Sequence, residues 1–364
     1  MSSRDAVAHA AKVADRDRSV MEKRRRLTED VVQALADAGF ARHFVPRRFG
    51  GCEGEFTPLI EATAALGETS PAAAWCAGLY AAHGWLASHL PEAAQHELWR
   101  TSPDTRIAAV VPLGSSTAAA VPGGWRLTGR WQFASGVDHA DWVLLAARTG
   151  QDDQEHRLFA VPGGRVTILD TWQTLGMQGT GSNTVEVTDV VVPEHRTCTM
   201  ADMLRPREGA ARCHQVPFAM VGPLLLASPI LGAARGALAA WIGAMAHRSD
   251  KDGAHARPSS HAQLVLGRAA AQIRAAGLLL GEGAKRADHA AVTKLLVAEG
   301  QRDAAAAVEL CTEAVDRLFR ALRAHGQAVE DPVQRHWRDI TTAATHTALS
   351  LETASAVYAD AVFG

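Results

Sequence analysis

The sequence has few residues of the kinds that form cross-links or soft-metal sites. Only five of its 364 residues are cysteines, and no two of them form a CxxC pair. They are Cys52, Cys76, Cys198, Cys213 and Cys311. An odd and scattered set of this kind predicts neither a disulfide framework nor a zinc site. We therefore expect no bound metal.

The sequence also lacks an excess of either charge. Lys and Arg number 37, Asp and Glu number 39, and the formal net charge is −2. This balance excludes a strongly basic nucleic-acid binder and gives no sign of an acidic tail. Hydrophobic residues make up 47% of the chain and charged residues 21%, which argues against disorder. A chain of this length is long enough for two or three ordinary domains.

Targeting and membrane-spanning signals are missing as well. The first residues, MSSRDAVAHAAKVADRDR, carry too many charges for a secretory signal peptide. The most apolar stretch, residues 217–245, contains Pro217, Pro223 and Pro229 and is interrupted by Arg235. We interpret it as a loop and a buried bundle helix rather than a membrane span. These observations predict a cytoplasmic protein with no membrane partner.

Three blocks of different composition follow one another along the chain. Residues 1–105 have helical patterns such as LTEDVVQALADAGF, in which Thr28 can cap the start and Gly39 can end the helix. Residues 106–200 hold short strand-like runs separated by Pro-Gly-Gly and Gly-Gly turns. Residues 201–364 return to long Ala- and Leu-rich patterns, which predict four or five long helices packed as an antiparallel bundle. The predicted fold is mostly α, with a central β domain between an N-terminal helical domain and a C-terminal bundle.

No stand-alone catalytic motif occurs, because the sequence has no P-loop, no HExxH and no GxSxG. Residues 176–183, GMQGTGSN, form a glycine-rich loop that lies between strand patterns. A dinucleotide-binding glycine loop follows a strand and opens a helix, so the pattern does not indicate a Rossmann fold. Taken alone, this loop predicts a cluster of β-turns.

Four segments, in order, nevertheless resemble the acyl-CoA dehydrogenase superfamily over nearly the whole chain. They are residues 44–51 (FVPRRFGG), 124–142 (GWRLTGRWQFASGVDHADW), 175–193 (LGMQGTGSNTVEVTDVVVP) and 334–339 (QRHWRD). The resemblance implies a flavin-binding fold with an N-terminal helical domain, a middle β-barrel or sandwich and a C-terminal four-helix bundle. Proteins of this family are usually homotetramers.

One departure from the family pattern bears on the chemistry. Acyl-CoA dehydrogenases abstract an α-proton with a glutamate that most often follows the C-terminal Arg-Asp by several residues, where it must face both substrate and flavin. Here no carboxylate occurs between Asp339 and Glu352, and residues 231–238 also lack an acid. The departure argues against α,β-dehydrogenation. The sequence is more similar to the two-component, reduced-flavin-dependent monooxygenases, such as the p-hydroxyphenylacetate, steroid-phenol and dibenzothiophene enzymes.

This closer resemblance implies an enzyme that receives reduced FMN or FAD from a separate NAD(P)H:flavin reductase. With O2, a C4a-hydroperoxyflavin would hydroxylate an aromatic or other electron-rich small molecule, and the residues do not distinguish FMN from FAD. The phenol and thiophene members carry a histidine on an N-terminal helix, a serine before an SG turn, and a histidine after the C-terminal Arg-Asp. The matching residues here are His83, Ser135 and His346, the candidate catalytic residues. Histidine titrates near neutrality and can deprotonate or hydrogen-bond a phenol.

The same resemblance implies residues that hold the flavin. A serine hydroxyl can hydrogen-bond the flavin ring, and an apolar pocket with walls such as Trp85 would exclude water. Arg257 lies near the place where the family has a phosphate-contacting arginine from a neighbouring subunit, and arginine suits phosphate because of its forked donors. The candidate cofactor-binding residues are Trp131, Phe133, Ala134, Ser135, Gly179, Thr180, Ser182 and Arg257.

Three alternatives stay open at this point. The same scaffold could N-oxygenate an amine or an amino sugar, whose site would be richer in polar side chains. It could be an acyl-CoA dehydrogenase or oxidase with a relocated base, which would bind oxidised FAD tightly. It could also be a non-catalytic helical oligomer that has lost its cofactor.

Overall fold

The computed structural model describes residues 4–149, 155–204, 209–246 and 259–364. The chain divides into two compact units. The β unit comprises residues 1–55, 76–173 and 178–217, and the helical unit comprises residues 56–75, 174–177 and 218–364. The finer division into domains 1–105, 106–200 and 201–364 stays a prediction.

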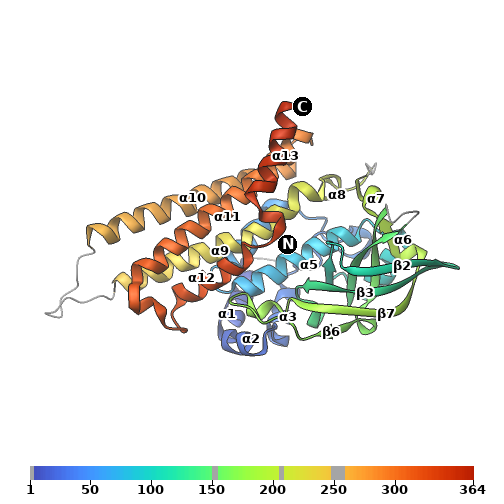
Figure 1. Cartoon of the computed structure of the whole chain (residues 1–364), viewed down its shortest axis with the longest axis horizontal. Coiled ribbons are helices and arrows are strands. Elements are labelled where there is room, and N and C mark those ends of the chain that lie inside the picture. Colours follow the sequence, from blue (N-terminus) through green and yellow to red (C-terminus); the bar gives the residue numbers. More distant parts are fainter. Residues whose placement is uncertain (1–3, 150–154, 205–208, 247–258) are drawn as a thin grey trace. The chain divides into compact units, whose positions relative to one another are not determined.

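Two four-stranded sheets form the centre of the β unit (Figure 1). Their strand orders are β1-β4-β5-β8 and β2-β3-β7-β6. The β1–β4 pair is parallel, and the other pairs are antiparallel. The strands are β1 (Ile107–Val110), β2 (Ser115–Val121), β3 (Gly124–Ala134), β4 (Trp142–Thr149), β5 (Glu155–Pro162), β6 (Thr167–Leu169), β7 (Asn183–Pro193) and β8 (Thr197–Thr199). The predicted central β domain is confirmed.

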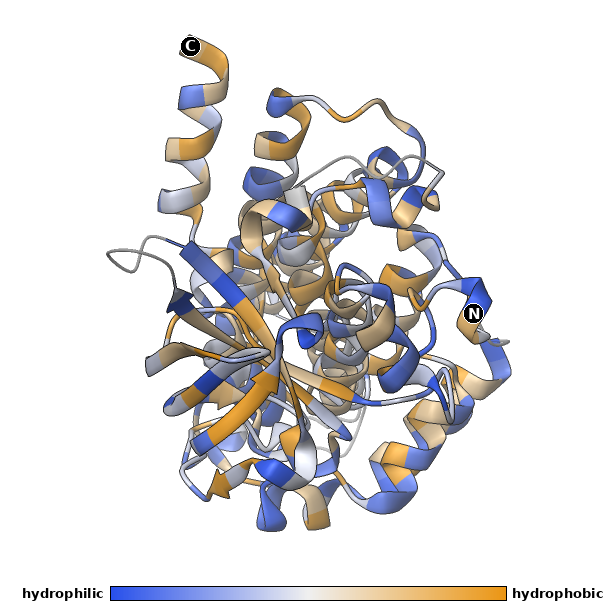
Figure 2. Cartoon of the chain, turned by 90° about the vertical axis from the view of Figure 1, so that its right-hand side faces the viewer, coloured by the Kyte–Doolittle hydropathy of each residue, from blue (hydrophilic) through white to orange (hydrophobic). Residues whose placement is uncertain are grey.

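The apolar side chains of the strands build one shared core. On β7, Val185 and Val187 are buried before a register shift against β3, and Val190 and Val192 are buried after it. The shift is a bulge, which returns the apolar residues to the core face although the period of two is interrupted. Figure 2 shows apolar runs along these strands.

Helices complete the β unit. They are α1 (Arg4–Arg16), α2 (Arg18–Arg24), α3 (Glu29–Asp37), most of α5 (Pro71–Ala87), α6 (Glu92–Trp99), α7 (Met200–Leu204) and α8 (Arg212–Gln215). The predicted cap of α3 is confirmed, because the Thr28 side chain accepts a hydrogen bond from the Val31 N–H at 3.3 Å. Helix α5, PAAAWCAGLYAAHGWLA, is apolar all round and almost wholly buried, as expected of a central helix.

The helical unit contains α4, from the N-terminal part of the chain, and the helices of the C-terminal block, where long helices were predicted. They are α4 (Phe56–Gly67), α9 (Phe218–Ala246), α10 (Ser260–His289), α11 (Lys294–Leu322), α12 (Pro332–Ala343) and α13 (Leu351–Phe363). Helices α9, α10 and α11 run alongside one another (Figure 1). Two of the described helices, α9 and α10, are long and apolar enough to cross a membrane by length and composition alone, but α9 is mostly buried inside the protein. This confirms the interpretation of residues 217–245 as containing a buried bundle helix.

The glycine-rich segment and the C-terminal Arg-Asp meet inside the helical unit. The Gly176 N–H donates to the Thr342 hydroxyl at 2.9 Å, and the Met177 N–H donates to the Asp339 carboxylate at 2.6 Å. A Cβ on Gly176 would lie 2.1 Å from the Arg338 carbonyl oxygen, so only glycine permits this approach. Two of the four sequence segments are thus in direct contact.

Candidate functional site

The end of β3 has a strained backbone. Phe133 has a φ of 68°, and the β3–β7 register shifts between Trp131 and Ala134. A non-glycine residue in this region costs about 1–3 kcal/mol, and such strain gathers at ligand-binding positions. The bulge turns the Phe133 side chain outward, where it is 67% exposed, while Trp131 and Ala134 are buried. Phe133 meets Trp172 edge to face, with ring centroids 6.3 Å apart. The pair offers an aromatic surface to a ligand.

Three buried hydroxyl groups follow immediately. The Ser135 Oγ lies 2.6 Å from the Ser182 Oγ, which lies 2.6 Å from the Thr180 Oγ1. Thr180 ends a short 3-10 turn, η5 (Gln178–Thr180), in which Gly179 is also buried. All three hydroxyl-bearing residues are buried. The structure thus joins three of the predicted cofactor-binding residues into one hydrogen-bonded row, which we call the hydroxyl chain.

Helix α5 fixes the backbone around the hydroxyl chain. The Tyr80 hydroxyl donates to the Gly136 carbonyl at 2.9 Å, and the Gly136 N–H donates to the Thr180 carbonyl at 2.8 Å. The Cys76 thiol also donates to the Thr180 carbonyl, at 3.7 Å. Burial raises the pKa values of Cys76 and Tyr80, so both groups stay protonated donors. Sequence reasoning missed Tyr80, although it lies one helical turn before His83.

Two predicted wall residues serve the core through their side chains. The Trp131 indole N–H donates to the Ala146 carbonyl at 2.7 Å, and Trp131 is fully buried among the strands. The Trp85 indole N–H donates to the Cys213 carbonyl, also at 2.7 Å. Both rings therefore have structural partners, whereas Phe133 is open to a ligand.

His83 is a buried, neutral histidine on α5. Its Nδ1 lies 2.8 Å from the Ile107 carbonyl oxygen at the start of β1. A carbonyl can only accept, so Nδ1 carries the proton and Nε2 is left as an acceptor. Burial lowers the pKa of His83 to about 4. The side chain can therefore accept a hydrogen bond from a substrate hydroxyl at neutral pH.

His346 belongs to the helical unit and has the opposite tautomer. Its Nδ1 accepts a hydrogen bond from the Ala348 N–H at 3.2 Å, at the start of the short turn η8 (Thr347–Leu349). The proton of the neutral ring is therefore on Nε2, which becomes a donor. The ring meets Trp75 edge to face, with centroids 5.9 Å apart. Part of His346 reaches solvent, yet the surrounding protein disfavours the imidazolium and lowers its pKa.

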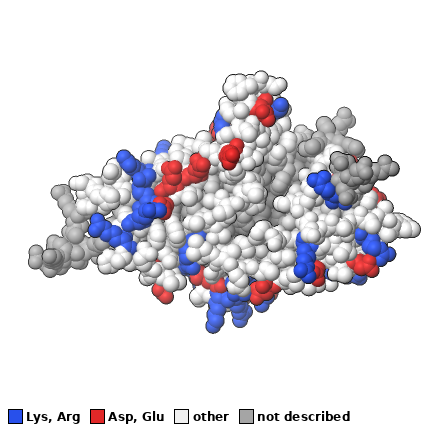
Figure 3. Space-filling model, in the orientation of Figure 1, with Lys and Arg blue, Asp and Glu red and all other residues white. Residues whose placement is uncertain are grey.

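An arginine-lined groove of about 480 Å³ lies between α10 and α11. We call it the arginine groove. Figure 3 shows Lys and Arg side chains gathered over the end of the bundle where α10 begins and α11 ends. Its lining includes Arg268, Arg317, Arg320 and Arg323 together with Glu313 and Asp316. Arg320 pairs with Asp316 at 2.7 Å, whereas the buried Nε of Arg317 has no hydrogen-bond partner among the described residues. The predicted phosphate contact, Arg257, lies outside the described residues.

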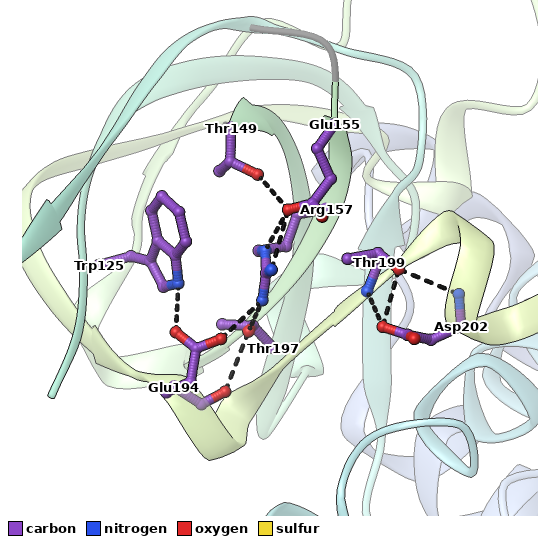
Figure 4. A network of polar contacts seen from close by, with 8 residues as sticks. All are labelled: Trp125, Thr149, Glu155, Arg157, Glu194, Thr197, Thr199 and Asp202. Carbon is purple, nitrogen blue, oxygen red and sulfur yellow. Dashed lines mark hydrogen bonds and ion pairs between the residues drawn. The ribbon is translucent and has the colours of Figure 1, made fainter. Parts of the chain in front are cut away.

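A second polar cluster, in the β unit, is internally satisfied (Figure 4). Arg157 pairs with Glu155 at 2.8 Å and with Glu194 at 2.9 Å. The Trp125 indole N–H donates to Glu194 at 2.5 Å, and the Arg157 guanidinium lies over the Trp125 ring. Because its charged groups and hydrogen-bond donors are paired with one another, this cluster links β3, β5 and the turn before β8.

These donor sets fit a flavin. A flavin has a flat ring with hydrogen-bonding groups along one edge, and a tail that carries phosphate. The aromatic surface of Phe133 and the hydroxyl chain suit the ring, because a hydroxyl can both donate and accept. Fold and donor sets together define a flavoprotein of the acyl-CoA dehydrogenase fold.

Comparisons with known proteins agree. Residues 224–351 match the family described as acyl-CoA dehydrogenase, C-terminal domain. The chain is 31% identical to the flavin-dependent monooxygenase oxygenase subunit HsaA of Mycobacterium tuberculosis, covering 96% of this chain and 92% of the relative. It is 32% identical to the oxygenase component of the FADH2-dependent resorcinol hydroxylase of Rhizobium sp., covering 98% and 94%. The structure of XiaF from Streptomyces sp. in complex with FADH2 and glycerol superposes with a TM-score of 0.93 at 30% identity, over 99% of this chain and 94% of that one.

This chain therefore belongs to the oxygenase components of the flavin-dependent monooxygenases. It is an oxidoreductase, and its cofactor is a reduced flavin. Membership in this family favours the monooxygenase interpretation over a dehydrogenase with a relocated base and over a non-catalytic oligomer.

Proposed function

We propose that this protein hydroxylates an aromatic or phenolic small molecule with O2 and a reduced flavin delivered by a separate NAD(P)H:flavin reductase. The observation that carries the proposal is likeness, over nearly the whole chain, to oxygenase components that include a resorcinol hydroxylase. When bound, the reduced flavin supplies the two electrons that convert one oxygen atom of O2 to water while the other atom enters the substrate.

The side chains have separate roles in this proposal. His83 accepts a hydrogen bond from the phenolic hydroxyl through Nε2, which raises the electron density of the ring to be oxygenated. His346 can donate a hydrogen bond from its Nε2–H. The flavin ring contacts the hydroxyl chain (Ser135, Ser182 and Thr180). It also contacts the backbone of Phe133–Ala134 and Gly179. Buried apolar neighbours of these groups exclude water and limit the unproductive loss of peroxide.

A single-turnover experiment tests this function. The protein is mixed anaerobically with dithionite-reduced FMN or FAD and a phenol, such as resorcinol or 4-hydroxyphenylacetate, and isotopically heavy O2 is then added. We expect a hydroxylated product that carries one heavy oxygen atom, and no label when only the water is heavy. Reoxidation of the flavin with a full yield of hydrogen peroxide for every phenol would contradict the proposal. Oxygenation of an amine alone would establish the N-oxygenase alternative.

We further propose that the chain forms a homotetramer. One face of α10 exposes Leu264 and Leu278 with the small residues Gly267, Ala271 and Ala275 between them. The spacing of three and four residues aligns them in one stripe, and the small residues let a second helix approach closely. A stripe of this kind supports helix packing against another copy of the chain.

The arginine groove gives a prediction about the flavin tail. We propose that this groove binds the flavin phosphate in the assembled protein. Charge-assisted hydrogen bonds of this kind are worth about 1.5–3 kcal/mol, so Arg317→Gln should weaken FMN or FAD binding about 10- to 100-fold. Riboflavin, which has no phosphate, should bind the variant and the parent equally well in fluorescence titrations. The matched control is Arg165→Gln, an exposed arginine of the β unit that lies outside the groove. Equal losses for riboflavin and FMN would refute the phosphate assignment.

A further inference from the structure

Asn183 lies between the two halves of the aromatic surface. It is the first residue of β7, it is 5% exposed, and it pairs with Ala134 just after the bulge that turns Phe133 outward. Its side chain reaches the other half, the segment that follows β6. The Asn183 Oδ1 accepts hydrogen bonds from the Thr171 N–H and the Trp172 N–H, each at 3.1 Å. One buried residue thus adjoins the segments that carry both aromatic rings.

The orientation of the Asn183 amide follows from its partners. A backbone N–H can only donate, so the side-chain atom that receives two of them is the carbonyl oxygen. The amide NH2 therefore faces the other way, and its Nδ2 donates to the Asp138 carboxylate at 3.4 Å. The Asp138 side chain is itself mostly buried. The amide is thus held from both sides and cannot turn over without losing these bonds.

The two bonds to Asn183 fix consecutive peptide planes of the segment 171–172. The second plane leads directly into the Cα of Trp172, so it sets the direction in which the indole leaves the chain. The indole meets Phe133 edge to face, with ring centroids 6.3 Å apart. Phe133 has a φ of 68° and an exposed ring. A strained residue of this kind keeps its conformation only where its surroundings hold it.

We propose that Asn183 is a positioning residue of the flavin site, which holds the backbone of Trp172 so that the indole stays against Phe133 before the flavin binds. This rests on the proposed binding of the flavin ring at the aromatic surface. A surface that is already formed binds more tightly, because the flavin does not have to order the two rings. Without the Asn183 oxygen, the two N–H groups turn to water and the indole moves away from Phe133. In this role Asn183 acts through Trp172 and not by touching the flavin.

The free protein gives the first readout, which does not depend on the flavin. The near-ultraviolet circular dichroism of Trp172 is the difference between the spectra of the parent and Trp172→Phe. We expect the same difference to be largely lost in the Asn183→Ala background, because an indole that moves freely contributes little. The matched control is Thr184→Val, which removes the hydroxyl that accepts from the Thr171 hydroxyl at 2.8 Å and leaves the bonds of Asn183 intact. It should keep the signal, and an unchanged signal in Asn183→Ala would overturn the proposal.

A double-mutant cycle then measures the effect on the flavin. Dissociation constants for dithionite-reduced FMN and FAD are determined anaerobically by equilibrium dialysis. We expect Trp172→Ala and Asn183→Ala each to weaken binding about 3- to 10-fold, the scale of one aromatic contact. Because both changes act through one side chain, the double variant should stay within about twofold of Trp172→Ala. If Asn183→Ala weakens binding equally with and without Trp172, it acts by another route and the proposal is overturned.

The two readouts separate this inference from the function on which it rests. If Asn183→Ala loses the dichroism signal but Trp172→Ala binds flavin as the parent does, the flavin ring does not bind at the aromatic surface. The role of Asn183 in the flavin site is then overturned together with that contact, whereas hydroxylation is tested independently with labelled oxygen. Thermal melting identifies a variant that fails to fold. Asn183→Ser, whose shorter side chain cannot reach both N–H groups, then takes the place of Asn183→Ala in both measurements.

Discussion

A single methyl group added at Gly232 is expected to destabilise the helical unit severely. Gly232 lies in the middle of α9, where α4 crosses it. A Cβ at this position would lie 2.1 Å from the Ala64 carbonyl oxygen and 2.8 Å from the Gly67 Cα. Both are backbone atoms of α4, so no side-chain rotation can relieve the overlap. The two helices must move apart, and overpacking of this kind costs about 3 kcal/mol or more.

This cost is a large part of the stability of an ordinary domain, which is about 5–15 kcal/mol. The matched control is Gly243→Ala on the same helix, where nothing lies within 4 Å of the added Cβ. The free energy of unfolding of this control should rise by about 0.5–1 kcal/mol, because alanine loses less conformational entropy than glycine when a helix forms. Urea unfolding of both variants is the measurement. Equal midpoints for Gly232→Ala and the parent protein would show that α4 and α9 do not pack as described.

The sequence predicted the helical and β regions well because their patterns are local. Turn residues mark the ends of the strands, and apolar runs mark the bundle helices. Pro223 and Pro229 are exceptions to a local rule, since proline normally breaks a helix. Both lie inside α9, which begins at Phe218, so the predicted loop ends before that residue. Burial of the helix on nearly every side holds it together despite the missing N–H groups.

The candidate site was predictable only in part. Ser135, Thr180 and Ser182 were found through the two glycine-containing segments that hold them. Their direct linkage depends on the pairing of β3 with β7, which no local pattern reveals. The positive φ of Phe133 and the support from Tyr80 also depend on contacts between distant segments. The arginine groove joins Arg268 to residues about fifty positions later, so its charges could not be grouped from spacing alone.

Replacement of His83 by asparagine is expected to reduce kcat about 10²–10⁴-fold with little loss of flavin binding. An asparagine amide N–H can take over the bond of Nδ1–H to the Ile107 carbonyl, but asparagine has no group in the place of Nε2. The variant therefore removes the proposed acceptor for the phenolic hydroxyl and keeps the bond that holds α5 to β1. The control is His156→Asn on β5, a histidine that also bonds a backbone carbonyl, that of Val111 at 3.2 Å. It should keep parental activity.

The pH dependence gives a second, independent test of the state of His83. Its pKa is about 4 in the folded protein and about 6.5 in an unfolded chain. Between these values the unfolded state binds more protons, so the contribution of His83 to stability is complete above about pH 6.5 and declines as the pH falls towards 4. Because of His83, the free energy of unfolding of the parent should be about 2 kcal/mol lower at pH 5 than at pH 7. Urea unfolding at the two pH values measures this difference, and His83→Asn should lack it. Equal losses of stability in the variant and the parent would show that His83 is protonated near neutrality. An acid limb of the parent's kcat near pH 6.5 that the variant lacks would show the same, and His83 could then not be the neutral acceptor of the proposed mechanism.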